Sequence, residues 1–446
     1  MLISFSVENW MSFRDLTSFS MVGGRELQHK ERVPRIKKYQ TKILPIAALY
    51  GGNASGKTNF FEAIDFAKWL IVKGPKTDKS PIPVEIFKLD PLAIERPSSF
   101  IFEILINEII YEYRFSVNRK KIIEEKLVRI TSSNEWVLFD RQNQNIEFHK
   151  TIKKNKFLAF AFYGTDENQL FLNNSVSQKV PNFRNIYDWF EDTLTLIRPD
   201  SKFQGLDQFF NDNHPLNLSM KTILPHLDTG ITGIGGETIP LETIKMTPEQ
   251  KLELEEDLPE KGGILLYTTG QERFFVSRQD GEVIVTRMVT FHTDINGKDI
   301  KFDLSQESDG SVQVMELLPA IIDLVQPDSK KVYIIDEIDR SLHTLLTREL
   351  IEGFLMSCSN NSRSQLLFTT HDVLLMDQHL FRRDEMWVAE RDTNGATKLF
   401  SFSDFSDIRN DKDIRRSYLS GRIGGIPRLL LSGALTTKID DKKAEG

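Results

Sequence analysis

A glycine-rich run at 51–58 has the residue types and the spacing of a loop that binds phosphate groups. It reads Gly-Gly-Asn-Ala-Ser-Gly-Lys-Thr and fits the pattern G-x-x-x-x-G-K-[S/T]. The glycines let backbone N–H groups turn toward phosphate oxygens, and the N-terminus of a following helix adds partial positive charge. We expect Lys57 to reach the β- and γ-phosphates of a nucleotide and the Thr58 hydroxyl to ligate Mg²⁺. The other candidate nucleotide-binding residues of this loop are Asn53, Ala54, Ser55, Gly56 and Asn59.

A second candidate is the apolar run 331–335, which ends in two adjacent carboxylates, Asp336 and Glu337. Asp336, at the end of the strand, is expected to hold Mg²⁺ through its water shell, and Glu337 to orient or deprotonate an attacking water. Acidic residues also follow many ordinary strands where they leave a sheet. The phosphate-binding pattern upstream is what favours the catalytic interpretation here.

Two weaker signals lie on either side of this acidic strand. Upstream, the turn Glu-Ser-Asp-Gly-Ser at 307–311 opens an apolar helical run, so Ser308 is either a second phosphate-binding group or a plain helix N-cap. Downstream, Thr-Thr-His-Asp at 369–372 follows another apolar run. His371 could sense a γ-phosphate by hydrogen bonding, although most single histidines are packed or surface residues.

The elements around these motifs follow from apolar spacing. Strands are expected at 43–50, 332–335 and 365–369, with helices at 60–72, 312–325 and 345–356. This alternation predicts a mostly parallel sheet. Runs of β-branched and aromatic residues at 98–165 predict an antiparallel meander, and 273–303 a further hairpin. Because Lys57 and Asp336 are 336 − 57 = 279 residues apart, inserted material must separate the two halves of the nucleotide-binding core.

Composition limits the class of protein. The chain has 446 residues, of which 40% are hydrophobic, and a formal net charge of −7, so no global basic field attracts nucleic acid. One cysteine, Cys358, excludes an intramolecular disulfide framework and indicates a cytoplasmic setting. No apolar run reaches the roughly 18–20 residues that a membrane span requires. The segment 166–262 holds 8 Lys/Arg and 17 Asp/Glu, a net charge of 8 − 17 = −9, on a nearly neutral remainder.

The order of these motifs resembles the ABC-type ATPase heads of the RecF/SMC/OLD group, in particular the compact AAA15-like branch. The resemblance rests on the opening FSVENWMSF at 5–13, the loop GGNASGKTNFFEAI, ESDGS, IIDEIDRSLHTLLTREL and TTHD. It covers about 1–70 and 300–427. It implies an α/β fold: a P-loop ABC/SMC-type head with an antiparallel β lobe and an inserted, mainly helical subdomain. On this basis we divide the chain into head (1–95), β lobe (96–165), acidic helical insert (166–262) and head again (263–446).

The same resemblance implies roles for individual residues. Ser308 and Gly310 would belong to a signature loop that contacts the γ-phosphate bound by another subunit, although the sequence departs from the ABC consensus LSGGQ. Asp339 would belong to a D-loop at the dimer interface, and His371 would be the switch histidine. The glutamine loop is not identified, and Gln169 and Gln178 are both candidates. The segment 418–431 is typical of this branch, and its glycines either approach a partner or form a turn.

For function, the resemblance implies an ATP- and Mg²⁺-dependent ATPase that works as a homo-oligomeric switch or scaffold in bacterial anti-phage defence, as in PARIS-type and OLD-like systems. Its expected partner is a separate effector protein such as a nuclease, and no association with a membrane is expected. The alternative is a RecF-like DNA-repair ATPase that binds DNA ends or gaps, which the acidic insert disfavours. The basic stretches 30–42 and 150–156 could touch nucleic acid, but sparse aromatic residues favour a solvated face.

Overall fold

The computed structural model describes residues 1–446 except 204, 211–212, 261, 269–270, 406–413 and 420–446. Most of the segment 418–431 therefore lies outside the described residues. The chain divides into two compact units, each continuous in space but not in sequence. Unit 1 comprises Met1–Leu196, Lys330–Glu337 and Ser359–Gly446, and unit 2 comprises Ile197–Ser329 and Ile338–Cys358.

A six-stranded sheet in unit 1 places the candidate motifs. Its order is β11-β17-β18-β5-β19-β20, where β17, β18, β5 and β19 are parallel neighbours and β20 is antiparallel to β19. The strands are β11 (Leu194–Ile197), β17 (Val332–Ile335), β18 (Gln365–Thr369), β5 (Ile46–Tyr50), β19 (Met386–Arg391) and β20 (Thr397–Ser401). Every residue of β5 and β18 is buried, as expected for inner parallel strands. The mostly parallel sheet predicted from the sequence is confirmed.

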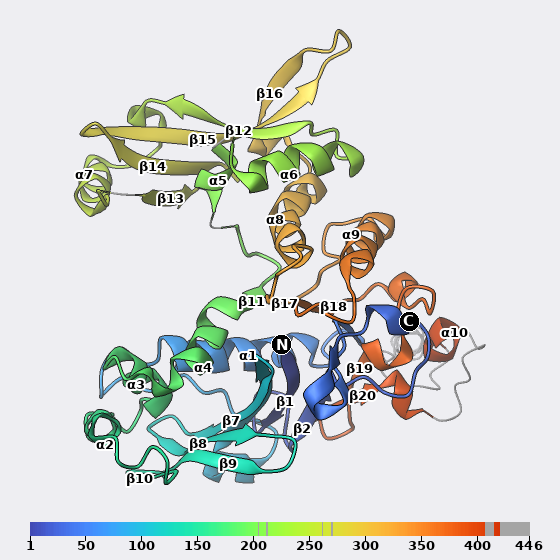
Figure 1. The fold of residues 1–446 in the computed structure, drawn as a ribbon. Coiled ribbons are helices and arrows are strands. Elements are labelled where there is room, and N and C mark those ends of the chain that lie inside the picture. The colour runs from blue at the N-terminus through green and yellow to red at the C-terminus, as the bar shows by residue number, and fades with distance from the viewer. Residues whose placement is uncertain (204, 211–212, 261, 269–270, 406–413, 420–446) are drawn as a thin grey trace, which may run out of the picture. The chain divides into compact units, whose positions relative to one another are not determined.

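A seven-stranded antiparallel sheet forms the rest of the β structure of unit 1, apart from the short pair β3 (Arg35–Ile36) and β4 (Thr41–Lys42). Its order is β10-β9-β8-β7-β6-β1-β2, and all of these strands except β6 are labelled in Figure 1. The strands are β10 (Asn145–Phe148), β9 (Glu135–Gln142), β8 (Ile122–Ile130), β7 (Ile109–Val117), β6 (Ser98–Ile106), β1 (Leu2–Glu8) and β2 (Thr17–Ser20). The meander is thus present, but β6 pairs with β1. The boundary expected at 95 therefore does not separate two compact bodies.

The helices α1 to α4 of unit 1 pack on a shared aromatic core. The helices of this unit are α1 (Lys57–Val72), α2 (Lys156–Tyr163), α3 (Phe171–Ser177), α4 (Arg184–Asp188) and α10 (Ile414–Leu419), and a π-helical turn follows α4 at Trp189–Thr193. Phe171, Phe183 and Trp189 are buried in the same cluster as Phe60 of α1. Residues 166–196 therefore belong to unit 1, and the acidic helical insert expected at 166–262 is divided between the units. Surface charge distinguished this segment in the sequence, but its buried aromatic rings decide where it packs.

Unit 2 contains its own antiparallel sheet and helices. The sheet has the order β12-β15-β14-β13, with β16 also paired to β15. Its strands are β12 (Gly233–Ile239), β13 (Gly263–Tyr267), β14 (Arg273–Gln279), β15 (Glu282–Thr293) and β16 (Asp299–Asp303), and its helices are α5 (Leu206–Phe210), α6 (Pro215–Ile223), α7 (Pro248–Asp257), α8 (Asp309–Leu324) and α9 (Thr344–Ser357). The strand β12 lies within the stretch expected to be helical, because its β-branched residues complete the sheet of the 273–303 hairpin. Within the described chain, no helix is both long and apolar enough to cross a membrane.

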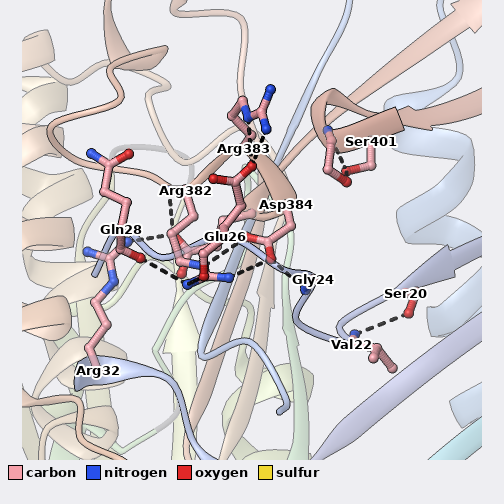
Figure 2. A network of polar contacts seen from close by, with 12 residues as sticks. Ser20, Val22, Gly24, Glu26, Gln28, Arg32, Arg382, Arg383, Asp384 and Ser401 are labelled. Carbon is pink, nitrogen blue, oxygen red and sulfur yellow. Dashed lines mark hydrogen bonds and ion pairs between the residues drawn. The ribbon is translucent and has the colours of Figure 1, made fainter. Parts of the chain in front are cut away.

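A buried ionic network fixes the loop after β2 to the segment before β19. Figure 2 shows Arg382 at its centre, bound to the Asp384 carboxylate at 2.8 and 2.6 Å and to the Gln28 carbonyl at 2.9 Å. The backbone N–H of Gly24 also donates to Asp384, at 2.7 Å. Close by, Glu385 accepts from Arg32 at 2.5 Å and from the Arg382 N–H at 2.9 Å. The network therefore ties two segments more than 350 residues apart in sequence.

We predict that Glu385 makes the stability of unit 1 depend on pH. Burial raises the pKa of its carboxyl from 4.5 to about 7, against the opposing effect of Arg32. The folded state then binds a proton that the unfolded state has already released, so stability falls as pH rises from about 4.5 to 7. Between pH 5.5 and 7.5 we expect a loss of roughly 2 kcal/mol from this group. All five tryptophans lie in unit 1, so tryptophan fluorescence during urea unfolding measures it.

Replacing this carboxyl with an amide provides the control. Glu385→Gln removes the titrating group and should flatten the pH dependence by the same amount, whereas the exposed neighbour Glu31→Gln should leave it as in the wild type. An unchanged pH dependence in Glu385→Gln would contradict the assignment.

Candidate nucleotide site

The glycine-rich loop connects β5 to α1, as the sequence predicts. Gly51 and Gly56 have φ of +154° and +106°, a region that side-chain-bearing residues rarely adopt. A Cβ on Gly51 would lie 2.6 Å from the Ala389 carbonyl oxygen, and one on Gly56 would collide with the side chain of Thr397. The two glycines are therefore required both by backbone conformation and by the close approach of β19 and β20.

The opening segment 5–13 supports this loop from behind. The Thr397 hydroxyl donates to the Ser55 carbonyl at 2.9 Å and lies 2.8 Å from the Ser12 hydroxyl. The indole N–H of Trp10 donates to the Asn59 carbonyl, at 3.2 Å, in the first turn of α1. These contacts give the opening motif a physical role, because they fix the position of the loop and of the helix that it begins.

Lys57 is the buried cation of the site. It is 4% exposed, and its Nζ donates to the carbonyl oxygens of Gly51, at 2.8 Å, and Gly52, at 3.1 Å. His371 Nδ1 lies 3.4 Å from the same nitrogen. The ammonium is therefore held inside the curve of the loop, next to His371, which lies two residues after the end of β18.

Asp336 lies at the carboxyl end of β17 and is 3% exposed. Its Oδ1 accepts a hydrogen bond from the Thr369 hydroxyl at 2.6 Å, and Thr58 also bonds to this carboxylate. Burial raises the pKa of Asp336, while the bonds from Thr369 and Thr58 and the charge of Lys57 oppose that rise. A carboxylate beside a hydroxyl is a hard oxygen donor pair, which fits Mg²⁺.

Glu337 follows directly, in a left-handed backbone conformation with φ of +51°. Its N–H donates to the Thr369 hydroxyl at 2.8 Å, so Thr369 bonds to both consecutive acidic residues. The Glu337 carboxylate lies 3.5 Å from His371 Nε2, and both side chains are about one third exposed. The strained backbone separates the two acids: Asp336 is buried against Thr58, and Glu337 faces His371.

The glycine-rich loop, Glu337 and His371 line one cavity of about 480 Å³, within the size range of small-ligand sites. Its lining residues are Asn53, Ala54, Ser55, Gly56, Lys57, Thr58, Asn59, Glu337, His371 and Arg391. The seven loop residues singled out in the sequence thus meet Glu337 and His371 at one place. Parallel strands explain this convergence, because β5, β17 and β18 all end at the same edge of the sheet.

Three further candidates belong to the other compact unit. Ser308, Gly310 and Asp339 belong to unit 2, whereas every residue that lines the cavity belongs to unit 1. Ser308 is the N-cap of α8, with its hydroxyl 3.1 Å from the Ser311 N–H. A Cβ on Gly310 would lie 2.8 Å from the carbonyl oxygen of Ser341, so the signature-like and D-loop-like turns are neighbours.

Neither glutamine-loop candidate lies at the cavity. The Gln169 amide donates to Asn173 at 2.9 Å, and the exposed Gln178 ends α3. Neither side chain is among the residues that line it, so within the described chain the geometry favours neither as a glutamine loop.

Two residues of the site were not assigned from the sequence. Thr369 stood inside the quoted Thr-Thr-His-Asp motif, but only its histidine received a role. Arg391 ends β19, a strand that the sequence analysis did not identify, and its Nε donates to the Gly395 carbonyl at 2.7 Å. The apolar run Met-Trp-Val-Ala before Glu390 was the available signal for this strand. Because β19 is parallel to β5, the two strands end at the same edge of the sheet, which brings Arg391 to the cavity.

Comparison with known proteins agrees with this geometry. The family model described as "AAA domain, putative AbiEii toxin, Type IV TA system" matches residues 46–377, more than half of the chain, including the loop, the acidic strand and His371. The chain belongs to this family of AAA ATPase domains. Family membership identifies the cavity of this AAA domain as a candidate nucleoside triphosphate site. A search of curated proteins found no significant match.

Two solved structures are similar to this AAA domain at low identity. One is the SMC head domain from Thermotoga maritima, 14% identical, with 90% of this chain and 98% of that chain covered and a TM-score of 0.35. The other is an SMC head bound to the C-winged helix domain of ScpA, 11% identical, with 90% and 97% covered and a TM-score of 0.37. Both likenesses are distant.

Proposed function

We propose that this AAA domain is an ATP-hydrolysing switch that assembles with further copies of itself and holds or releases a separate effector protein. The observation that carries the proposal is the meeting of Lys57, Asp336, Glu337 and His371 around one loop that opens a helix. Phosphate binding needs the loop and its cation, and hydrolysis needs a carboxylate beside the terminal phosphate.

Each side chain has a role that suits its surroundings. The N–H groups of the loop and the Lys57 ammonium bind the phosphates. Thr58 and Asp336 hold Mg²⁺, which neutralises phosphate charge when bound. The partly exposed Glu337 orients and deprotonates the attacking water. His371, whose Nε2 lies 3.5 Å from the Glu337 carboxylate, hydrogen-bonds the terminal phosphate group.

Assembly is proposed from the residues of unit 2. Ser308 and Gly310 adjoin the turn that contains Asp339, and a helix N-terminus such as that of α8 favours an anion. We propose that these residues complete the nucleotide site of another copy. ATP would then join two domains, and hydrolysis would separate them.

The biological setting is proposed as bacterial anti-phage defence, with a nuclease as one candidate effector. The description of the family names an AbiEii toxin and a type IV toxin–antitoxin system, which supports a toxic effector under control. The alternative, a RecF-like repair ATPase, predicts that DNA stimulates ATP turnover many-fold at physiological salt.

Glu337→Gln is the test of the assembly step. The amide cannot deprotonate water but keeps the shape of the side chain, so the variant should retain ATP and remain assembled. We expect its mass, measured by light scattering after gel filtration, to at least double with ATP and Mg²⁺ but not with ADP. Adding Ser308→Arg to Glu337→Gln should abolish that increase in mass. The single variant Glu349→Gln, which changes an exposed acidic residue on α9, should behave as the wild type. Retention of ATP without any increase in mass would contradict the switch.

The effector is sought by co-purification with the neighbouring gene products, comparing the wild type with Glu337→Gln. We expect one protein to bind only one nucleotide state of the domain.

A further inference from the structure

Helix α2 exposes a row of three aromatic rings, which we call the aromatic row: Phe157, Phe160 and Tyr163. Their exposed fractions are 74%, 69% and 91%. Residues three apart lie on one side of a helix, whereas Leu158 and Ala161 of the same helix are fully buried. Contiguous exposed rings are uncommon on a soluble surface and mark binding sites.

The aromatic row is held rigidly from below. Asn155 caps α2 by accepting the Phe157 N–H at 3.0 Å. The buried amide of Asn174 donates to the carbonyls of Ala161, at 2.8 Å, and Gly164, at 3.1 Å. The Phe162 ring packs edge-on against Phe171, with centroids 5.8 Å apart. These contacts fix both ends of α2, so exposure of the row is not a sign of a fraying helix end.

Positive charge is concentrated at the start of this helix and in the turns before it. Residues 149–164 contain four lysines and no acidic residue, and all four lysines are exposed: Lys150, Lys153, Lys154 and Lys156. Compact turns fold this stretch, since the N–H groups of Ile152 and Lys153 both donate to the His149 carbonyl at 2.9 Å. The first acidic residues after α2 are Asp166 and Glu167. An anionic ligand is therefore favoured.

A further exposed ring lies at the start of this stretch. Trp136 of β9 is 40% exposed and stacks on His149, with centroids 5.5 Å apart and planes 11° apart. The Arg129 guanidinium lies 5.8 Å from the Trp136 ring. Exposed aromatic rings thus both precede and follow Lys150, Lys153 and Lys154 in the sequence.

We propose that α2 and the turn before it bind single-stranded nucleic acid, with bases stacked on the aromatic row and phosphates on the lysines. Rings three residues apart in a helix are separated by about 4.5 Å along its axis, close to the spacing of successive bases. Every base has a π-face, so stacking does not require a sequence. The exposed side carries rings and Ala159 rather than aliphatic anchors, which favours bases over lipid chains.

Residues 150–156 would then bind nucleic acid, rather than form the solvated face that the sequence favours. In the sequence the rings follow the lysines rather than alternate with them, so interleaving looked sparse. Folding of 149–155 into turns brings both kinds of residue to one region. The site lies in unit 1 and uses no residue of the nucleotide cavity, so it stands or fails independently of the ATPase switch.

The aromatic row is tested by fluorescence anisotropy of the full chain with fluorescein-labelled 20-mers of deoxythymidine and of uridine at 50 mM salt. The triple variant Phe157→Ala/Phe160→Ala/Tyr163→Ala should weaken binding at least tenfold. Leu92→Ala/Ile94→Ala removes apolar side chains that are each 71% exposed elsewhere on unit 1 and should change binding less than twofold. Basal ATPase activity should be unchanged in both.

The lysines are tested through salt dependence. For single strands, each neutralised phosphate contributes about 0.7 to the slope of log affinity against log salt, so Lys153→Gln/Lys154→Gln should make it shallower by about 1.4. Lys73→Gln/Lys76→Gln removes the same charge from another exposed site and should leave the slope unchanged. Absent oligonucleotide binding, or equal affinity in the triple variant, overturns the proposal. Co-sedimentation with phosphatidylserine vesicles, lost in the triple variant while oligonucleotides do not bind, would instead show a lipid site.

Discussion

Lys57→Ala is expected to lower kcat/KM for ATP by at least 100-fold. The ammonium is buried inside the glycine-rich loop, where low exposure would strengthen its attraction for phosphate charge. Removing one preorganised electrostatic group from a catalytic site costs on the order of 100- to 1000-fold in rate. Release of inorganic phosphate from ATP, measured with and without Mg²⁺, gives the rate, and titration calorimetry with a non-hydrolysable ATP analogue gives the affinity.

Two controls separate chemistry from folding. Lys73→Ala removes a lysine at the other end of the same helix, where the side chain is exposed, and should keep the wild-type rate. Lys57 also ties the loop to its own carbonyls, so the variant's urea midpoint is measured to show that unit 1 remains folded. A folded Lys57→Ala protein that hydrolyses ATP within threefold of the wild type would show that 51–58 is not the phosphate loop.

The sequence contained enough information to assemble most of the candidate site. A parallel sheet brings the ends of its strands to one edge, so locating the apolar strands before Gly51, Asp336 and the Thr369–Asp372 segment was sufficient to bring Lys57, Glu337 and His371 together. The wide gap between the motifs also had a physical meaning, because the larger segment of unit 2, Ile197–Ser329, is inserted between them. Local patterns work well where one rule of topology fixes the geometry.

Other features depend on pairings that no local pattern specifies. The strand β19 was not predicted, and Arg391 at its end was therefore not assigned to the site. A short apolar run followed by charged residues is also typical of ordinary surface strands. The expected boundary at 95 lies within one compact unit, because the partner of β6 is β1, nearly 100 residues earlier. The segment 166–196 was assigned to an insert because of its acidic residues, but its buried aromatic residues pack in unit 1. In each case long-range packing, rather than composition, determined the outcome.

Glu125→Ala is expected to destabilise unit 1 by about 3–5 kcal/mol, the cost of leaving a buried charge without its partner. Glu125 is fully buried and lies 3.4 Å from the guanidinium of Arg141, which is itself 1% exposed. It accepts hydrogen bonds from the Tyr113 hydroxyl at 2.9 Å and from the N–H groups of Phe171, at 2.6 Å, and Leu172, at 2.9 Å. The carboxylate therefore binds the first turn of α3, whose N–H groups have no partner within the helix.

Glu124→Ala is a matched control on the same strand. Its side chain points to the opposite face of β8, where a partly exposed pair with Arg114 at 3.1 Å should contribute at most about 1 kcal/mol. Urea unfolding followed by tryptophan fluorescence compares the two variants. Glu125→Gln removes the charge, so Arg141 loses its counter-ion, but it keeps one of the two acceptor oxygens. Because Phe171 donates to Oε2 and Leu172 to Oε1, one of these two α3 N–H groups keeps its acceptor in the variant. Burial raises the pKa of Glu125, and the charge of Arg141 is the largest effect that opposes this rise. We therefore expect Glu125→Gln to cost less than Glu125→Ala but more than Glu124→Ala. Equal costs for Glu124→Ala and Glu125→Ala would show that this buried pair does not hold α3 in place.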